Sequence, residues 1–125
     1  MQAVHLRCEH LNNPVGIDIQ RSRLFWCCEG GSRQTAWQVL AMADSGELLW
    51  DSGKVKSCTM HATLPHDVPP KTKVLWKVRL WDESDKVGEW AEAFFETGIN
   101  HWQAKWITGN DHVNSKRRYP VDCFR

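Results

Sequence analysis

Four carboxylates lie close together in the sequence, at Asp82, Glu83, Asp85 and Glu89. Two carboxylates about 5 to 10 Å apart across a sugar-sized cleft can hydrolyse a glycosidic bond. A charged cluster of this kind is more often the solvated tip of a hairpin, and a small domain offers no deep cleft. The sequence also lacks a Gly-Xaa-Ser-Xaa-Gly elbow and a phosphate-binding loop. We therefore expect no catalysis by this chain itself.

The same acidic loop fails as a calcium site. An EF-hand loop needs an oxygen ligand at its fifth position and a glycine at its sixth, where this chain has Lys86 and Val87. Calcium is therefore not expected.

Zinc requires paired cysteine or histidine ligands at short spacings. Cys8 and His10 are predicted to share a strand face, and His61 and His66 lie near a turn, but no paired Cys/His spacing completes a site. We expect neither a metal nor another cofactor.

The composition limits the class of partner. The chain of 125 residues carries 16 basic and 15 acidic residues, a net charge of +1, and its length fits one domain. Such a balance does not attract nucleic acid, and the short run Lys116-Arg117-Arg118 has no interleaved aromatics. No apolar run approaches the ~20 residues of a membrane helix. We expect neither nucleic acid nor a membrane as a partner.

The cysteines and the first residues bear on the cellular compartment. The opening MQAVHLRCEH lacks the basic and apolar regions of a secretory signal. The 5 cysteines are odd in number and irregularly spaced, which argues against a disulfide framework. We expect free thiols and a cytoplasmic protein.

Short runs of alternating apolar and polar residues recur along the chain between clusters of Gly, Pro, Asn, Asp and Ser. The predicted strands are Val4–Glu9, Arg23–Glu29, Gln34–Ala43, Glu47–Trp50, Cys58–Leu64, Thr72–Asp82 and Trp90–Thr97. Seven short strands with no strong helical pattern predict an all-β fold. The expected architecture is a seven-stranded antiparallel β-sandwich of the immunoglobulin or fibronectin type III class.

Alternation assigns the two faces of the longest predicted strand. The core face takes Val74, Trp76, Val78 and Leu80, and the outer face takes Leu75, Lys77, Arg79 and Trp81. The same rule predicts that Trp26 and Trp37 meet Trp76 inside the sandwich. In the last strand it turns Ala91, Ala93, Phe95 and Thr97 inward.

Outward tryptophans are the remaining candidates for binding. Trp81 with Lys77 and Arg79, and Trp90 across the hairpin, could form an aromatic platform for a sugar ring. Two alternatives are that the cationic side chains cover the rings as a cation–π ladder, or that this face packs against a neighbouring module. We favour the ladder or the interface over sugar binding.

The pattern changes after Gly98. Trp102 and Trp106 lie four residues apart at the exit from the predicted sandwich, and large rings there are expected to anchor an interface. The sandwich is predicted over residues 1–108. Residues 109–125 are predicted to be a linker or the truncated start of a following β-domain.

Several segments, taken together, resemble one family. They are Leu6–Glu9, Asn13–Asp18, Arg23–Trp26, Gln34–Val39, Leu49–Val55, Trp76–Asp82, Trp90–Glu92 and Phe95–Gly98, with Trp102, Lys105, Trp106 and Ile107 at the exit. In this order they are similar to the N-terminal fibronectin-type-III-like domain of bacterial α-L-rhamnosidases of glycoside hydrolase family 78. The resemblance covers about residues 4 to 109, and WDSGKV, WKVRLWD and FETG are its most specific parts.

The resemblance implies a non-catalytic accessory module of an enzyme that hydrolyses terminal α-L-rhamnosides. The catalytic (α/α) barrel of that family lies far downstream, so the implied partners are the following domains of the same polypeptide. The alternative is a carbohydrate-binding module that recognises rhamnose-containing glycans through exposed tryptophans. A free-standing adhesion domain is disfavoured by the missing signal sequence.

The sequence departs from general fibronectin type III domains at one corner. Where those domains place a tyrosine whose hydroxyl bonds the backbone, this chain has Val74. We expect Pro69-Pro70 to stiffen the turn instead.

Overall fold

The structure, a computed structural model, describes residues 1–107, which form strands and no helix. The strands are β1 (Gln2–Cys8), β2 (Val15–Ile17), β3 (Arg23–Glu29), β4 (Ala36–Ala43), β5 (Leu48–Asp51), β6 (His61–Thr63), β7 (Lys73–Trp81) and β8 (Ala91–Thr97). The predictions for residues 109–125 fall outside this part of the chain. No helix in the described part is long and apolar enough to cross a membrane.

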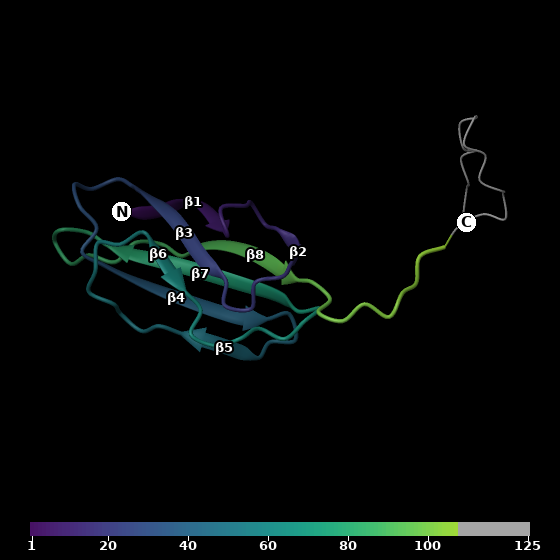
Figure 1. Cartoon of the computed structure of the whole chain (residues 1–125). Helices are drawn as coiled ribbons and strands as arrows, with labels where there is room; N and C mark the ends of the chain where they lie inside the picture. The colour runs from purple at the N-terminus through teal and green to yellow at the C-terminus, as the bar shows by residue number, and fades with distance from the viewer. Residues whose placement is uncertain (108–125) are drawn as a thin grey trace, which may run out of the picture.

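Two sheets stack to form a β-sandwich (Figure 1). The smaller sheet has the order β1-β3-β6, and the larger has the order β2-β8-β7-β4-β5. All pairs are antiparallel except β2 with β8. The predicted fold class is therefore confirmed.

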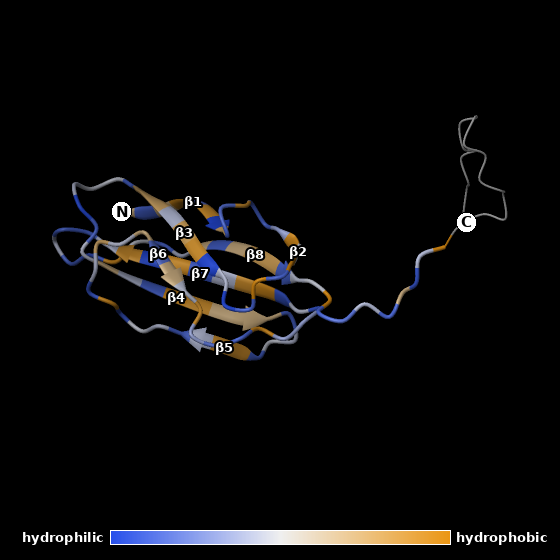
Figure 2. Ribbon diagram, in the orientation of Figure 1, coloured by the Kyte–Doolittle hydropathy of each residue, from blue (hydrophilic) through white to orange (hydrophobic). Residues whose placement is uncertain are grey.

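The core lies between the sheets and takes residues from both. Figure 2 shows hydrophobic residues along the strands of both sheets. Trp26 and Trp37 contact each other edge to face, with ring centroids 5.5 Å apart, and Trp76 is buried in the same cluster. The four residues predicted for the core face of β7 are all buried. Alternation along this strand thus predicted its orientation correctly.

The described residues contain eight strands where seven were predicted. The additional strand is β2, which pairs in parallel with β8 and has Gly16 at φ +79°. It lies between the predicted strands Val4–Glu9 and Arg23–Glu29, where no strand was predicted. Three residues on a sheet edge are held by backbone pairing and are too few to show a period of two, so the sequence carries little signal for them.

The predicted strand Cys58–Leu64 is also shorter than expected, because only His61–Thr63 pair with β3. The buried Gln34 side chain donates from Nε2 to the carbonyl oxygens of Ser57 and Thr59, at 3.2 and 2.8 Å. These bonds hold the preceding segment away from the β3 ladder.

Candidate functional site

The outer face of the larger sheet carries a cation–π ladder, formed by Lys77, Arg79, Trp81 and Trp90. Lys77 Nζ lies 5.0 Å from the Trp90 ring centroid. Arg79 Cζ lies 4.5 Å from the Trp90 ring and 5.1 Å from the Trp81 ring. Alternation along β7 places three of these side chains on one face, and the chain that enters β8 supplies Trp90. The guanidinium of Arg79 thus bridges both indoles.

Trp81 is buried, with 8% of its surface exposed, although its place on the outer face suggested an open ring. A second cation covers the Trp81 ring and accounts for its burial, because Lys54 Nζ lies 4.8 Å from the ring centroid. Lys54 belongs to the segment after β5, which sequence alternation could not place beside β7. Trp90 is half-buried. A ring contacted by two cations offers little free area for stacking a sugar.

Hydrogen bonds hold the ladder in position. Arg79 donates from Nε and Nη2 to Gln38 Oε1, at 3.0 and 2.8 Å. Gln38 Nε2 donates to Asp51 Oδ1 at 2.8 Å, and the Gly53 amide donates to the same oxygen. These two bonds, that from Gln38 first, hold the pKa of Asp51 below its usual range. A ligand would have to break this chain of bonds to recruit the guanidinium.

The acidic hairpin after β7 is a structural turn. Asp82 Oδ1 accepts two backbone hydrogen bonds from its own turn, each 2.9 Å long, and Asp85 forms an ion pair with Lys54. Glu83 Oε2 accepts the Ser32 amide at 3.1 Å. Bonds from backbone amides, including its own and that of Ser32, lower the pKa of Glu83. A general acid in glycoside hydrolysis needs a raised pKa, so this arrangement does not fit that role.

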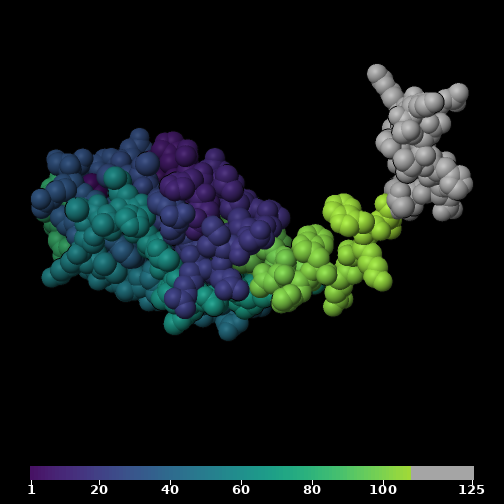
Figure 3. Space-filling model, viewed as in Figure 1, coloured from purple at the N-terminus to yellow at the C-terminus, as the bar shows by residue number. Residues whose placement is uncertain are grey.

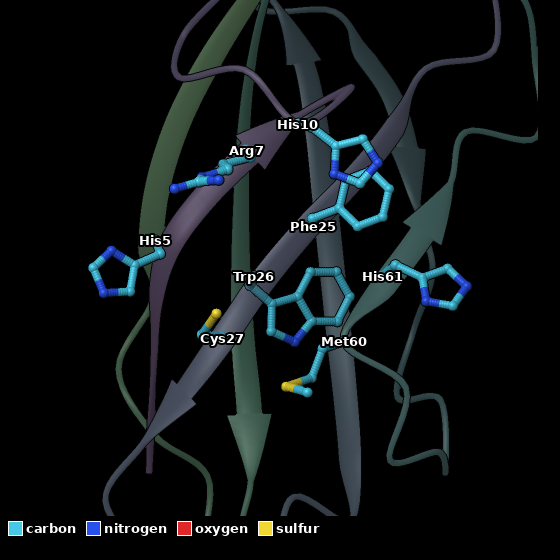
Figure 4. A pocket seen from close by; sticks show the side chains of 8 residues that line it. All are labelled: His5, Arg7, His10, Phe25, Trp26, Cys27, Met60 and His61. Atoms are coloured by element: carbon cyan, nitrogen blue, oxygen red, sulfur yellow. The ribbon is translucent and has the colours of Figure 1, made fainter.

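The smaller sheet has a shallow hollow of about 530 Å³ on its outer face (Figure 4). Its lining is His5, Arg7, His10, Phe25, Trp26, Cys27, Met60 and His61. His10 stacks on Phe25 with ring centroids 4.1 Å apart. Figure 4 shows His5 and Arg7 pointing to one side of this pair and His61 pointing to the other. Because these side chains come from β1, β3, β6 and the residues next to β1 and β6, no sequence spacing reveals the hollow, and they do not converge on one ligand.

The expected sharing of a strand face by Cys8 and His10 is wrong. Cys8 is buried in the core, whereas His10 is exposed and stacks on the outer face. Glu9 and His10 have φ of +50° and +66°, so the chain turns at the end of β1 and alternation stops. Among residues 1–107 no three His, Cys, Asp or Glu side chains group as metal ligands would.

Trp102 and Trp106 lie in the segment that leaves the sandwich (Figure 3). Trp102 is 75% exposed and Trp106 is fully exposed. The start of this segment is held in place, because the Gly98 amide donates to the Ile17 carbonyl at 2.9 Å and the Gly98 carbonyl accepts the Lys71 amide at 3.0 Å. Two open indoles therefore follow a fixed exit point, which is an arrangement typical of a surface that another domain covers.

Comparison with known proteins gives a consistent result. Residues 3–101 match the family described as Rha78A-like, N-terminal immunoglobulin domain. An α-L-rhamnosidase of Streptomyces avermitilis is 36% identical over 114 residues, which cover 80% of this chain and 11% of that protein.

Solved structures show the same relationship. The α-L-rhamnosidase from Dictyoglumus thermophilum superposes with a TM-score of 0.79 at 31% identity, over 90% of this chain and 14% of that one. The third fibronectin III domain of a human protein superposes with a TM-score of 0.55 at 9% identity, over 85% of this chain and 88% of that one, a likeness of fold alone. The chain thus spans about a seventh or less of the rhamnosidases that it matches.

Proposed function

The chain belongs to the family of Rha78A-like N-terminal immunoglobulin domains, and we propose that it is the non-catalytic accessory module of a larger α-L-rhamnosidase. The parent enzyme would hydrolyse terminal α-L-rhamnosides with residues that lie in other domains. Two observations support the absence of a catalytic role here. Asp82, Glu83 and Asp85 of the acidic hairpin are bonded to backbone amides or to Lys54, and the rings of the ladder are covered by cations.

The open indoles of Trp102 and Trp106 carry this proposal. Each buries up to about 150 to 250 Å² when a neighbour covers it. They follow the fixed exit at Gly98, and the matched rhamnosidases are far longer than this chain. The partner would be the domain that follows in the same polypeptide, and the module would stabilise or position that domain.

The test uses the full enzyme. Deletion of residues 1–98 should lower its melting temperature more than it changes its relative kcat/KM toward different rhamnosides. The double variant Trp102→Ala and Trp106→Ala should lower the melting temperature in the same direction. Leu11→Ala, which truncates another exposed apolar side chain, is the control. A change in specificity without a change in stability would contradict the proposal.

A second candidate function is sugar binding by the same indoles. Trp102 and Trp106, with Ala104 and Lys105, line a hollow of about 520 Å³, and exposed indoles stack on sugar rings. Calorimetric titration with a rhamnoside should then give binding that Trp102→Ala removes. Heats near zero for both the native chain and Trp102→Ala would exclude sugar binding by these indoles and leave the accessory role as the supported function. Titration of Trp90→Ala tests the ladder in the same way.

The cellular compartment forms part of the proposal. Cys8, Cys27, Cys28 and Cys58 are free thiols. Three of them are exposed, which supports a reducing compartment such as the cytoplasm. Fractionation of the native host would test this point.

A further inference from the structure

A row of apolar side chains crosses the outer face of the larger sheet beside the cation–π ladder. Met42 on β4 pairs in register with Leu48 on β5 and with Leu75 on β7, and Leu75 pairs with Phe94 on β8. Several inward neighbours of these residues are buried, namely Ala41, Val74, Trp76 and Phe95. We call Leu48, Met42, Leu75 and Phe94 the apolar row.

The apolar row is unusual for a β-sandwich, because the outward residues of a solvated sheet face are normally polar. Leu48 is 57% exposed and Leu75 is 41% exposed. Phe94 is the aromatic member of the row, and Lys73 Nζ lies 4.8 Å from the centroid of its ring. The tryptophans of the ladder are covered by their own cations, whereas the centre of this row has no such cover. Leu48 and Leu75 thus expose apolar surface on either side of Met42, which is half-buried like Phe94. Exposed apolar side chains on neighbouring strands of this kind mark a contact site.

The apolar row lies near the end of the sheet from which the chain leaves. Phe94 precedes Gly98 by four residues, a distance of about 13 Å along an extended strand. The exit segment, residues 99–107, can span at most about 30 Å. A domain attached beyond this segment can therefore reach the row.

The dimensions of the row favour a tethered partner over a second copy of the chain. Four adjacent strands place its ends about 14 Å apart, and it is one side chain wide. A stable dimer needs about 800 Å² from each partner, which is more than such a row supplies. A domain on the same polypeptide has a high effective concentration, so a smaller patch is sufficient.

We propose that the apolar row is the surface on which the next domain of the same polypeptide packs. This inference rests on the proposed function and specifies which face of the sandwich is the interface. Trp102 and Trp106 would close the contact on one side, and Leu75 would lie at its centre. The ladder would then form the polar edge of the interface, with Lys77 and Glu92 beside the row.

Hydroxyl-radical footprinting of the full polypeptide tests this inference. Leu48 and Leu75 should be oxidised severalfold more slowly than Leu11, although the sandwich itself leaves the three side chains 57%, 41% and 54% exposed; Leu11 serves as the internal control. Leu75→Asp should lower the melting temperature of the full polypeptide, whereas Leu11→Asp should leave it nearly unchanged.

Two results would overturn the inference. Oxidation of Leu75 at the rate of Leu11 would show that the row is open to solvent. Protection that disappears on dilution, together with dissociation in gel filtration, would assign the row to a second copy of the chain. If the row is open but the double variant at Trp102 and Trp106 still lowers the melting temperature, the accessory role stands and only this inference fails.

Discussion

The Thr97 hydroxyl accepts a hydrogen bond from the Thr72 amide at 2.9 Å. The same hydroxyl donates to the Pro69 carbonyl at 2.6 Å, so one buried side chain ties the end of β8 to the turn that enters β7. General fibronectin type III domains hold a corner with a tyrosine hydroxyl. Here a threonine on the neighbouring strand bonds the turn, and Pro69 of the expected proline pair takes part through its carbonyl.

Replacement of Thr97 by valine should destabilise the domain by about 1 to 3 kcal/mol, because it leaves the Thr72 amide and the Pro69 carbonyl without a partner. Urea unfolding followed by tryptophan fluorescence measures the change. Thr97→Ser should recover most of the loss, since it keeps the hydroxyl. Thr63→Val, at an exposed position on β6, is the control. Equal midpoints for the two valine variants would refute this role.

Gln34→Leu should also destabilise the domain, by about 1 to 3 kcal/mol. The Gln34 side chain accepts the Trp26 indole N–H at 3.1 Å and donates to two carbonyls of the segment before β6, so leucine leaves buried polar groups unbonded. Gln20→Leu, at an exposed site, is the matched control. Thermal unfolding of both variants provides the comparison, and a loss no larger than that of the control would contradict the prediction.

Alkylation of the native protein should distinguish the buried cysteine from the exposed ones by their rates of reaction. Burial raises the pKa of the Cys8 thiol to about 12, so almost no thiolate forms at neutral pH. Cys27, Cys28 and Cys58 are exposed. Iodoacetamide followed by peptide mass spectrometry should label these three in the native protein and Cys8 only after denaturation. Labelling of Cys8 at the rate of the others would show that β1 opens readily.

Glu9→Gln should lower the melting temperature at neutral pH. Burial alone would raise the pKa of Glu9, but hydrogen bonds from the Arg23 side chain and amide, with its positive charge, outweigh burial and lower that pKa. The stabilisation is therefore present above the ordinary pKa of 4.5 and is lost as the pH falls through the lower folded value.

The comparison of Glu9→Gln with the native protein is made by thermal unfolding at several pH values. The difference in melting temperature should be largest at neutral pH and should shrink below about pH 4.5. Glu47→Gln, at an exposed site, is the control and should show no such trend. A difference that grows in acid would contradict the assigned sign.

Much of the sandwich could be predicted from local patterns. The predicted bounds of β3, Arg23–Glu29, are those observed, and Val74 and Trp76 point inward as expected. Alternation is a property of a single strand, so one sequence is enough to detect it. The prediction failed at β2, which is held by pairing with β8, and at the turn of Glu9 and His10, where positive φ interrupts the strand.

The sequence by itself determined the fold class, the family resemblance and the inward faces, because each depends on residues that are neighbours along the chain. Only the tertiary structure decided that Lys54 covers Trp81 and that Leu48, Met42, Leu75 and Phe94 form one row. Both relationships depend on the register between strands that are distant in sequence. Register is set by the packing of the whole sandwich, and the spacing within a single strand does not contain it.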